Sequence, residues 1–262
     1  MRTAFAAYSF NDAALALYQF IWHEYCDWYV EVSKIALYGS DPAAKRTTQR
    51  VLVQVLEQAL RLLHPFMPYI TEEIWQALPG EKPVASIMIA PYPSTTTAHR
   101  DAAAEEVMNQ LIETVRTVRN IRSELGLPPT APLSIRVAAD GRAEHVGALE
   151  PYIKALARVA AVELIGAGQR PSGEPSAMVE GLGEIFVPLR GVVDPAEVRK
   201  RLERDLTKVQ KELAGVEAKL GRADFVDKAP AEIVDKERQR STALHQRQAT
   251  LRKHLDVLRE QS

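Results

Sequence analysis

Apolar residues in the last quarter of the chain repeat with the period of a two-helix seam. From Leu202 to Leu220 they follow one another at spacings of 4, 3, 4, 3 and 4 residues, which is the a/d pattern of a heptad. A second segment after Pro230 keeps the same period. Gly221 ends a helix well, and Pro230 cannot lie deep inside one. The pattern therefore predicts a long antiparallel two-helix coiled coil over residues 194–262.

The returning half of this seam is imperfect. Glu237, Ser241 and Gln248 stand where the heptad period expects apolar residues. Polar residues at such positions weaken the pairing of the two helices. We therefore expect an arm that bends or moves when no partner holds it.

Residues 1–130 have the pattern of a helical bundle. Helices are expected over Phe10–Leu37, Pro42–Leu63, Tyr69–Leu78 and His99–Glu124, with a short apolar piece at Ser86–Ala90 against the bundle. Asn11 is expected to cap the first helix, and Asp41 before Pro42 to start the second. The first helix is apolar around most of its circumference, which predicts a central place in the bundle.

Polar residues of the first helix are interpreted structurally. Glu24, Asp27, Glu31 and Lys34 form a narrow stripe at helical spacing. Paired carboxylates can perform acid–base chemistry, but no histidine or metal set accompanies them, so we expect them to meet basic residues of a neighbouring helix. Cys26 is expected to be a small buried residue rather than a nucleophile.

Between residues 131 and 193 the pattern changes to a small α+β unit. Strands are expected over Leu133–Val137, Ala161–Ile165, Ala177–Glu180 and Glu184–Leu189, and a helix over Glu144–Ala157. Alternation of apolar and polar residues is the signal for the first strand. A unit of this length is expected to be too small for a large pocket. The predicted fold is therefore mainly α: a helical bundle, a small α+β connector and a coiled-coil arm.

Composition excludes several classes of protein without identifying a partner. Residues 194–262 hold 16 Lys and Arg against 13 Asp and Glu, and the rest holds 17 against 21, so the arm is only weakly basic. The single cysteine gives neither a disulfide framework nor a CxxC metal site, which fits a cytoplasmic protein. Apolar runs of the about 18 residues needed to cross a membrane are missing.

Motifs for catalysis are also missing. The sequence has no GxxxxGK[ST] or GxGxxG phosphate loop, no HExxH and no GxSxG. Its six histidines form no pair at i, i+4. We therefore expect no catalytic residue, no metal site and no cofactor in this chain.

Four segments resemble the valine–tRNA ligase family of class I aminoacyl-tRNA synthetases. They are Trp22–Tyr29, Leu62–Trp75, Arg119–Pro129 and Phe225–Glu237, they occur in the family's order, and the resemblance covers essentially the whole chain. The last is the most specific, because it looks like the turn and return helix of that family's C-terminal coiled coil. Isoleucyl and leucyl relatives share the bundle but not this ending.

The resemblance implies a separate role for each of the three parts of the chain. Residues 1–130 would be an anticodon-binding helical bundle truncated at its N-terminus, residues 131–193 a connector, and residues 194–262 an arm against the outer corner of tRNA. The parent enzyme would use ATP and Mg to attach valine to tRNA(Val) and would edit mischarged threonine. The HIGH and KMSKS motifs and the editing domain do not occur here. We therefore expect a non-catalytic C-terminal fragment or split-gene product, monomeric, whose partners are tRNA and the catalytic and editing domains.

Basic residues are the binding candidates, because phosphates supply most of the affinity for RNA through Lys and Arg. On the arm they are Lys200, Arg204, Lys208, Lys211, Lys219, Arg222, Lys228, Arg238, Arg240, Arg247, Arg252 and Lys253. Candidates on the anticodon side are Lys45, Arg46, Arg50, Arg116 and Arg119, and the fourth helix is expected to display Arg122 as well. Phe225 either stacks on an RNA base or closes the hairpin turn.

Two other interpretations stay open. The charges of the arm can be a solvated face without a partner. The heptads can also form an intermolecular coiled coil, which would make the chain a protein-interaction module. A ten-residue connection between the two helices favours pairing within the chain.

Overall fold

The computed structural model describes residues 2–94, 100–128, 131–139, 141–166, 168–169, 171, 173–189 and 195–259. Its internal contacts divide the chain into two units, Met1–Glu105 and Glu106–Ser262. The fourth long helix, α6 (Ala102–Glu124), falls mostly in the second unit. The three-part division at residues 130 and 193 remains a prediction.

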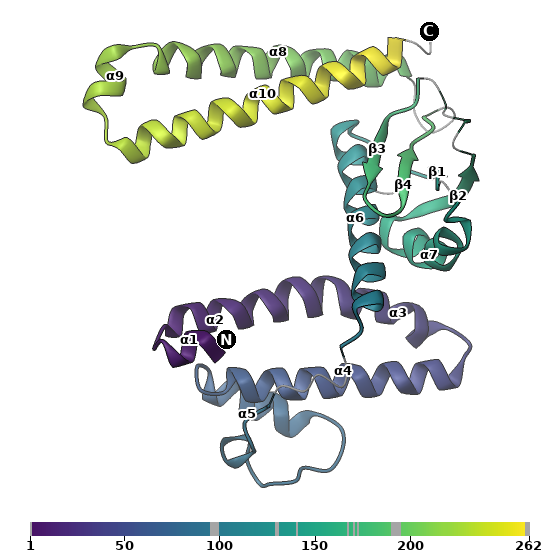
Figure 1. Cartoon of the computed structure of the whole chain (residues 1–262), viewed down its shortest axis with the longest axis vertical. Helices are drawn as coiled ribbons and strands as arrows, with labels where there is room; N and C mark the ends of the chain where they lie inside the picture. The colour runs from purple at the N-terminus through teal and green to yellow at the C-terminus, as the bar shows by residue number, and fades with distance from the viewer. Residues whose placement is uncertain are drawn as a thin grey trace. The chain divides into compact units, whose positions relative to one another are not determined.

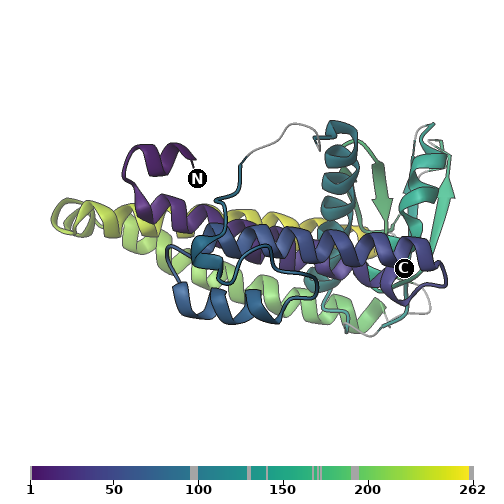
Figure 2. The ribbon, with the colours of Figure 1, turned by 90° about the horizontal axis from the view of Figure 1, so that it is seen from below.

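Two long antiparallel helical segments form the first unit (Figures 1 and 2). Its elements are α1 (Arg2–Ala6), α2 (Phe10–Tyr18), the π-helix η1 (Gln19–Tyr29), α3 (Val30–Tyr38), α4 (Pro42–Leu63), α5 (Pro68–Ala77) and the 3₁₀ turn η2 (Ile87–Ile89). The segments α2, η1 and α3 run on without a break, so the first expected helix is confirmed, with a π-helical middle that the pattern did not predict. Asp41 caps α4 as expected, because its Oδ1 accepts from the Ala43 N–H at 2.8 Å.

The N-cap expected at Asn11 is wrong by two residues. The residue before α2 is Ser9, so Asn11 already lies inside the helix. Ser9 Oγ donates to Asp12 Oδ2 at 2.6 Å and makes no bond to the helix N–H groups. The helix can start this early because the Ser9 carbonyl already accepts from the Ala13 N–H at 3.2 Å.

Cys26 is exposed, which contradicts the expectation that it is buried. Its neighbour Tyr25 faces α4 and donates its hydroxyl to the Leu52 carbonyl at 3.0 Å, so Cys26, the next residue, points elsewhere. Only one long helix of the described unit packs along this segment. Its other face leaves Tyr18 53% and Trp22 55% exposed, so the segment is not surrounded within its unit.

The polar stripe of the first helix pairs within that helix rather than with a neighbour. Lys34 Nζ lies 2.6 Å from Glu31 Oε1, and His23 Nδ1 lies 3.2 Å from Asp27 Oδ2. Both pairs join residues three or four positions apart. Glu24 and Asp27 are both exposed.

A small core joins α4, α5 and η2. Leu60, Trp75 and Ile87 pack together and are 4%, 0% and 3% exposed. The Trp75 indole Nε1 donates to Glu57 Oε1 at 2.9 Å, which satisfies a buried polar group. Glu72 accepts from the Ile87 N–H at 3.1 Å. The apolar piece expected against the bundle is therefore confirmed.

Among the residues described in the second unit, a four-stranded mixed sheet is accompanied by five helices, α6 included. The elements after α6 are β1 (Leu133–Ala138), α7 (Ala143–Ala157), β2 (Val159–Ile165), β3 (Ser176–Val179), β4 (Gly183–Phe186), α8 (Pro195–Leu220), α9 (Ala223–Lys228) and α10 (Ala231–Arg259). The sheet order is β2-β1-β4-β3, with β1 and β2 parallel and the other pairs antiparallel. Leu133, Ile135 and Val137 are fully buried, which confirms the alternation read in the sequence. The α7 helix crosses between the two parallel strands, as such connections require.

Arg122 is buried, at 6% exposure, so the expectation that α6 displays it is wrong. Its Nη1 donates to the Pro128 and Ala131 carbonyls at 3.1 and 2.9 Å. Its Nη2 donates to the Ala157 and Arg158 carbonyls at 3.4 and 3.1 Å. A guanidinium offers donors in a fixed fork, and here the fork joins α6, the loop after it and the end of α7.

Replacing Trp75 by alanine should lower the free energy of unfolding of the first unit by about 3–5 kcal/mol, the usual cost of removing a large buried aromatic. The matched control is Trp22→Ala in the same unit, at a side chain that is 55% exposed. Urea denaturation followed by circular dichroism measures both. Equal costs for the two variants would contradict the packing described for Trp75.

Candidate nucleic-acid interface

Most of the expected seam of the C-terminal arm is buried, while Leu206 and Leu220 are half-buried and the Leu258 side chain lies outside the described residues. The helices α8 and α10 run antiparallel and pack side by side, with α9 at the turn (Figure 1). Buried seam residues are Leu202, Val209, Leu213 and Val216 on α8, and Val234, Leu244, Leu251 and Leu255 on α10. The polar residues at heptad positions of α10, Glu237, Ser241 and Gln248, are half-buried. The period thus identified which side of each helix faces the other.

The tip of the arm contains a short helix that the sequence pattern did not predict. Phe225 of α9 is half-buried, and the Lys219 ammonium lies over its ring, 4.7 Å from the centroid. Lys219 also pairs with Glu237 at 2.5 Å. The ring face that would stack on a base is therefore occupied by Lys219, which favours the reading in which Phe225 closes the turn. The Lys228 side chain lies outside the described residues.

The ion pair at the tip alters the acidity of Glu237. Lys219 donates to its carboxylate and holds the pKa of Glu237 below the usual value, and nearby Arg240 and Lys236 add to the effect. The second oxygen, Oε2, is buried without a hydrogen-bond partner among the described residues. The polar interruption of the seam is thus a partly buried charge pair, in which the Lys219 side chain is 43% and the Glu237 side chain 15% exposed.

Four basic residues of α8 form one continuous face. Lys200, Arg204, Lys208 and Lys211 follow at spacings of four, four and three residues and are all exposed. At 3.6 residues per turn these positions fall within about 80° of arc, centred roughly opposite the seam. We call this set the α8 stripe. Its charges therefore face away from α10.

Basic residues of α10 do not form such a face. The candidates there, all exposed, are Arg238, Arg240, Arg247, Arg252 and Lys253. Their spacing spreads them over more than half of the helix circumference. Arg238 pairs with Asp235 at 3.4 Å, and Lys253 donates to the Ser176 carbonyl at 3.4 Å. Arg222, also exposed, precedes α9.

The anticodon-side candidates belong to different units. Lys45, Arg46 and Arg50 are exposed on the first turns of α4 in the first unit. Arg116 and Arg119 are exposed on α6 in the second. Arg119 Nη2 donates to the Leu156 carbonyl at 2.9 Å, so this side chain has a structural role as well.

Contacts at the base of the arm were not found from the sequence. Arg201 Nη1 donates to the Gly126 carbonyl at 2.7 Å, which joins α8 to the turn after α6. A Cβ at Gly126 would overlap the Arg201 guanidinium, and its φ of +57° also favours glycine. On the other helix, buried His254 lies with Nε2 2.7 Å from Glu124 Oε2. Both helices of the arm, α8 and α10, are thus joined to the end of α6.

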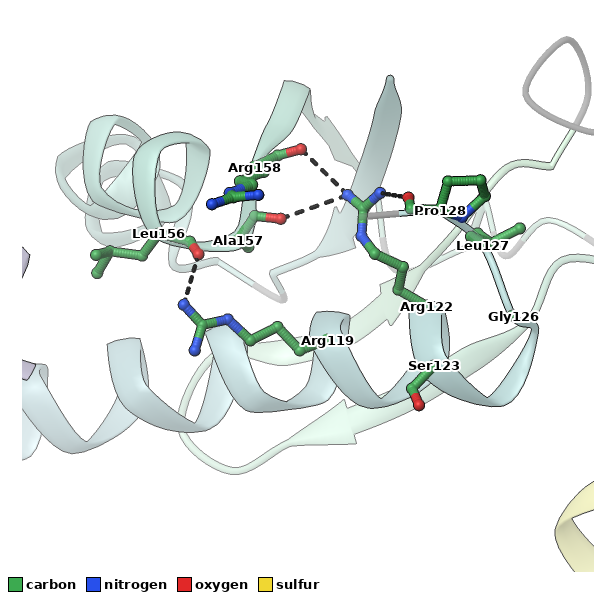
Figure 3. Close-up of a pocket in the computed structure, with 9 residues that line it drawn as sticks. All are labelled: Arg119, Arg122, Ser123, Gly126, Leu127, Pro128, Leu156, Ala157 and Arg158. Carbon is green, nitrogen blue, oxygen red and sulfur yellow. Dashed lines mark hydrogen bonds between the residues drawn. The ribbon is translucent and has the colours of Figure 1, made fainter. Parts of the chain in front are cut away.

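A cavity of about 630 Å³ opens where α6 and α7 end (Figure 3). Arg119, Arg122 and Arg158 line it together with Leu127 and Leu156. The guanidiniums of Arg119 and Arg122 reach from α6 toward the carbonyls at the end of α7. The expectation of no large pocket concerned residues 131–193 alone, and this cavity is lined mostly by α6 and the turn after it.

The described residues were compared with the requirements of a membrane-spanning helix and of a metal site. None of the helices described is both long and apolar enough to cross a membrane. Across the same residues, His, Cys, Asp and Glu side chains do not gather into a group of three that could hold a metal ion.

Comparison with known proteins gives two family matches. Residues 1–137 match the model of the anticodon-binding domain of tRNA ligases, and residues 194–259 match the tRNA-binding arm of valyl-tRNA synthetases. The valine–tRNA ligase of Syntrophotalea carbinolica is 42% identical over 97% of this chain, and that of Geobacter sulfurreducens 42% over 98%. The chain spans about 28% of the first relative's length and 29% of the second's.

The first half of the chain is therefore an anticodon-binding domain of the tRNA-ligase class. With the arm included, the chain belongs to the valine–tRNA ligase family. It contains the anticodon-binding domain and the tRNA-binding arm of that family.

Replacing Lys219 by alanine should raise the pKa of Glu237, because the main cause of its lowering is removed. A lowered pKa means that the pair stabilises the tip fully above an unfolded glutamate's pKa of about 4.3. This stability is lost as the pH falls through the lowered value. Carbon-13 NMR titration of the Glu237 carboxyl measures the shift.

The control is Lys208→Ala, which removes a lysine from the outer face of the same helix and should leave the Glu237 titration unchanged. An identical Glu237 titration in the Lys219→Ala variant and the unaltered chain would contradict the ion pair.

Proposed function

We propose that this chain is the tRNA-binding portion of a valine–tRNA ligase and that it holds tRNA(Val) for aminoacylation by other domains of the enzyme. In this proposal residues 1–130 bind on the anticodon side and residues 131–193 connect. Residues 194–262 form a long antiparallel coiled coil along the outer corner of the tRNA. ATP and Mg would be used by the catalytic domain, with editing in a further domain, and the enzyme would be cytoplasmic and monomeric.

The α8 stripe is the observation that carries the arm's role. It presents four cations on one helix face, while the apolar seam of the same helix is turned to α10. Structured RNA is recognised largely by its shape and its phosphate backbone. A straight row of cations along a helix of 26 residues suits successive phosphates of a polyanion. Arg238 and Lys253 are partly engaged by Asp235 and the Ser176 carbonyl, so α8 is the stronger binding face.

Pairing of the seam within the chain weighs against an intermolecular coiled coil. Leu202, Val209 and Leu213 are buried by contacts inside one molecule, so they are not available to a second copy. The match of residues 194–259 to a valyl arm weighs against an isoleucyl or leucyl origin. Sedimentation that shows a stable dimer losing helicity on dilution would favour the interaction module instead.

Changing all four residues of the α8 stripe to glutamine should weaken binding of tRNA and flatten its dependence on salt. Each lost phosphate contact lowers the slope of log affinity against log salt by roughly 0.7–0.9. Electrophoretic binding to valine tRNA and to an unrelated tRNA over a salt series measures both effects. Helicity measured by circular dichroism should stay unchanged, because the stripe faces solvent.

A second variant with the same net charge tests whether the position of the lost cations matters or only their number. It changes Arg238, Arg240, Arg247 and Arg252 of α10 to glutamine and should lose less affinity than the stripe variant. Equal losses would refute the special role of the α8 stripe. Absence of salt-sensitive binding to either tRNA by the unaltered chain would refute the proposed function itself.

A further inference from the structure

Arg158 adopts a backbone conformation that side chains rarely accept. It ends α7 in the left-handed region, with φ +53° and ψ +47°. Glycine is the usual residue at this position of a helix, because a Cβ is disfavoured there. Residues with strained backbone conformations are frequent at functional sites, where the strain accompanies a role of the residue in binding or catalysis. The Arg158 side chain lines the cavity and is exposed.

Two further guanidiniums of the cavity are fixed in place by carbonyl oxygens. Arg119 donates to Leu156, and Arg122 donates to Ala157 and Arg158 as well as to the loop after α6. The carbonyl oxygens orient both cations. Their positions are therefore set before any ligand arrives, which reduces the entropy lost on binding.

The positive charge of the cavity is not offset by its own lining. Besides the three arginines, the lining residues are uncharged. Burial lowers the pKa of Arg122, and the charge of Arg158, which lines the same cavity, lowers it further. Like charges held together in a recess attract an anion, since an anion relieves their repulsion.

The size and walls of the cavity suit more than a bare ion. Its volume of about 630 Å³ lies within the range of roughly 300–1,000 Å³ typical of small-molecule sites. Leu127, Pro128 and Leu156 supply apolar surface beside the arginines. Apolar and guanidinium surfaces together accept the flat face of a base, while guanidiniums bind phosphate.

We propose that this cavity is a binding site for one nucleotide unit, in which Arg158 contacts the phosphate and Leu127 and Leu156 contact the base or ribose. The nucleotide is either part of a bound RNA chain or free in solution. The RNA source rests on the proposed function and extends it, because it adds a contact away from the arm. Arg119 and Arg122 supply positive charge at fixed positions, and Arg158 is the exposed arginine that contacts the phosphate.

The test compares Arg158→Gly with Arg142→Gly in the full chain. Both substitutions remove one exposed arginine from an end of α7, and glycine suits both backbone positions. Thermal unfolding should show that Arg158→Gly is as stable as the unaltered chain or more so, since it relieves the left-handed strain. Loss of binding would then not be a loss of fold.

Calorimetric titration with adenosine monophosphate, inorganic phosphate and adenosine tests the site without RNA. We expect adenosine monophosphate to bind the unaltered chain and Arg142→Gly, with affinity roughly tenfold weaker for Arg158→Gly. Adenosine, which lacks the phosphate, should bind more weakly than adenosine monophosphate. A parallel salt series with tRNA should give a slope lower by roughly 0.7–0.9 for Arg158→Gly alone.

The titrations and the salt series together distinguish an RNA phosphate from a free nucleotide. They also distinguish failure of the cavity proposal from failure of the proposed function. A change in the tRNA slope assigns the site to an RNA phosphate, and loss of adenosine monophosphate binding with an unchanged slope assigns it to a free nucleotide. If the chain binds no tRNA, the proposed function fails, while the titration still decides the cavity. The site is refuted if Arg158→Gly leaves both the titrations and the tRNA slope unchanged.

Discussion

The buried guanidinium of Arg122 is the contact on which the second unit depends. It donates to four carbonyl oxygens, two in the loop after α6 and two at the end of α7. Hydrogen bonds from a charged donor contribute about 1.5–3 kcal/mol each, although such contributions are not additive. By fixing the end of α7 against α6, Arg122 creates one wall of the cavity. It also holds the turn whose Gly126 receives Arg201 of the arm. The cavity and the base of the arm thus share one support.

In the arm, the residues that maintain its structure are separate from those that can bind RNA. The seam of α8 is turned toward α10, and the α8 stripe is turned away from it, so a change on one face need not disturb the other. The exception is the tip, where Lys219 is both a candidate cation and a partner of Phe225 and Glu237. A charge interruption in an otherwise apolar seam costs desolvation. Glu237 also keeps one buried oxygen without a partner among the described residues, which adds to this cost.

The first unit differs, because much of its apolar surface remains uncovered. Tyr18 and Trp22 stack at 6.1 Å between ring centroids, with their planes 12° apart, and both are more than half exposed. The apolar circumference of this helix predicts a place at the centre of a bundle. Periodicity reports how much apolar surface a helix has and not how many neighbours it meets within one unit. The same reasoning explains the error at Cys26, whose residue type favours burial while its position beside Tyr25 does not.

The sequence by itself determined the order and type of nearly all elements, the faces of α8 and α10 that meet, and the family. These follow from period, capping residues and motifs, which are local and read within a few residues of one another. Only the tertiary structure decided what depends on distant contacts. It buried Arg122, placed Lys219 over Phe225, separated the α8 stripe from the scattered cations of α10, and made a cavity from α6 and α7. Arg119 and Arg158 are 39 positions apart in the sequence, and no local pattern brings two such residues together. Their proximity comes from the packing of a helix against the crossover of a sheet.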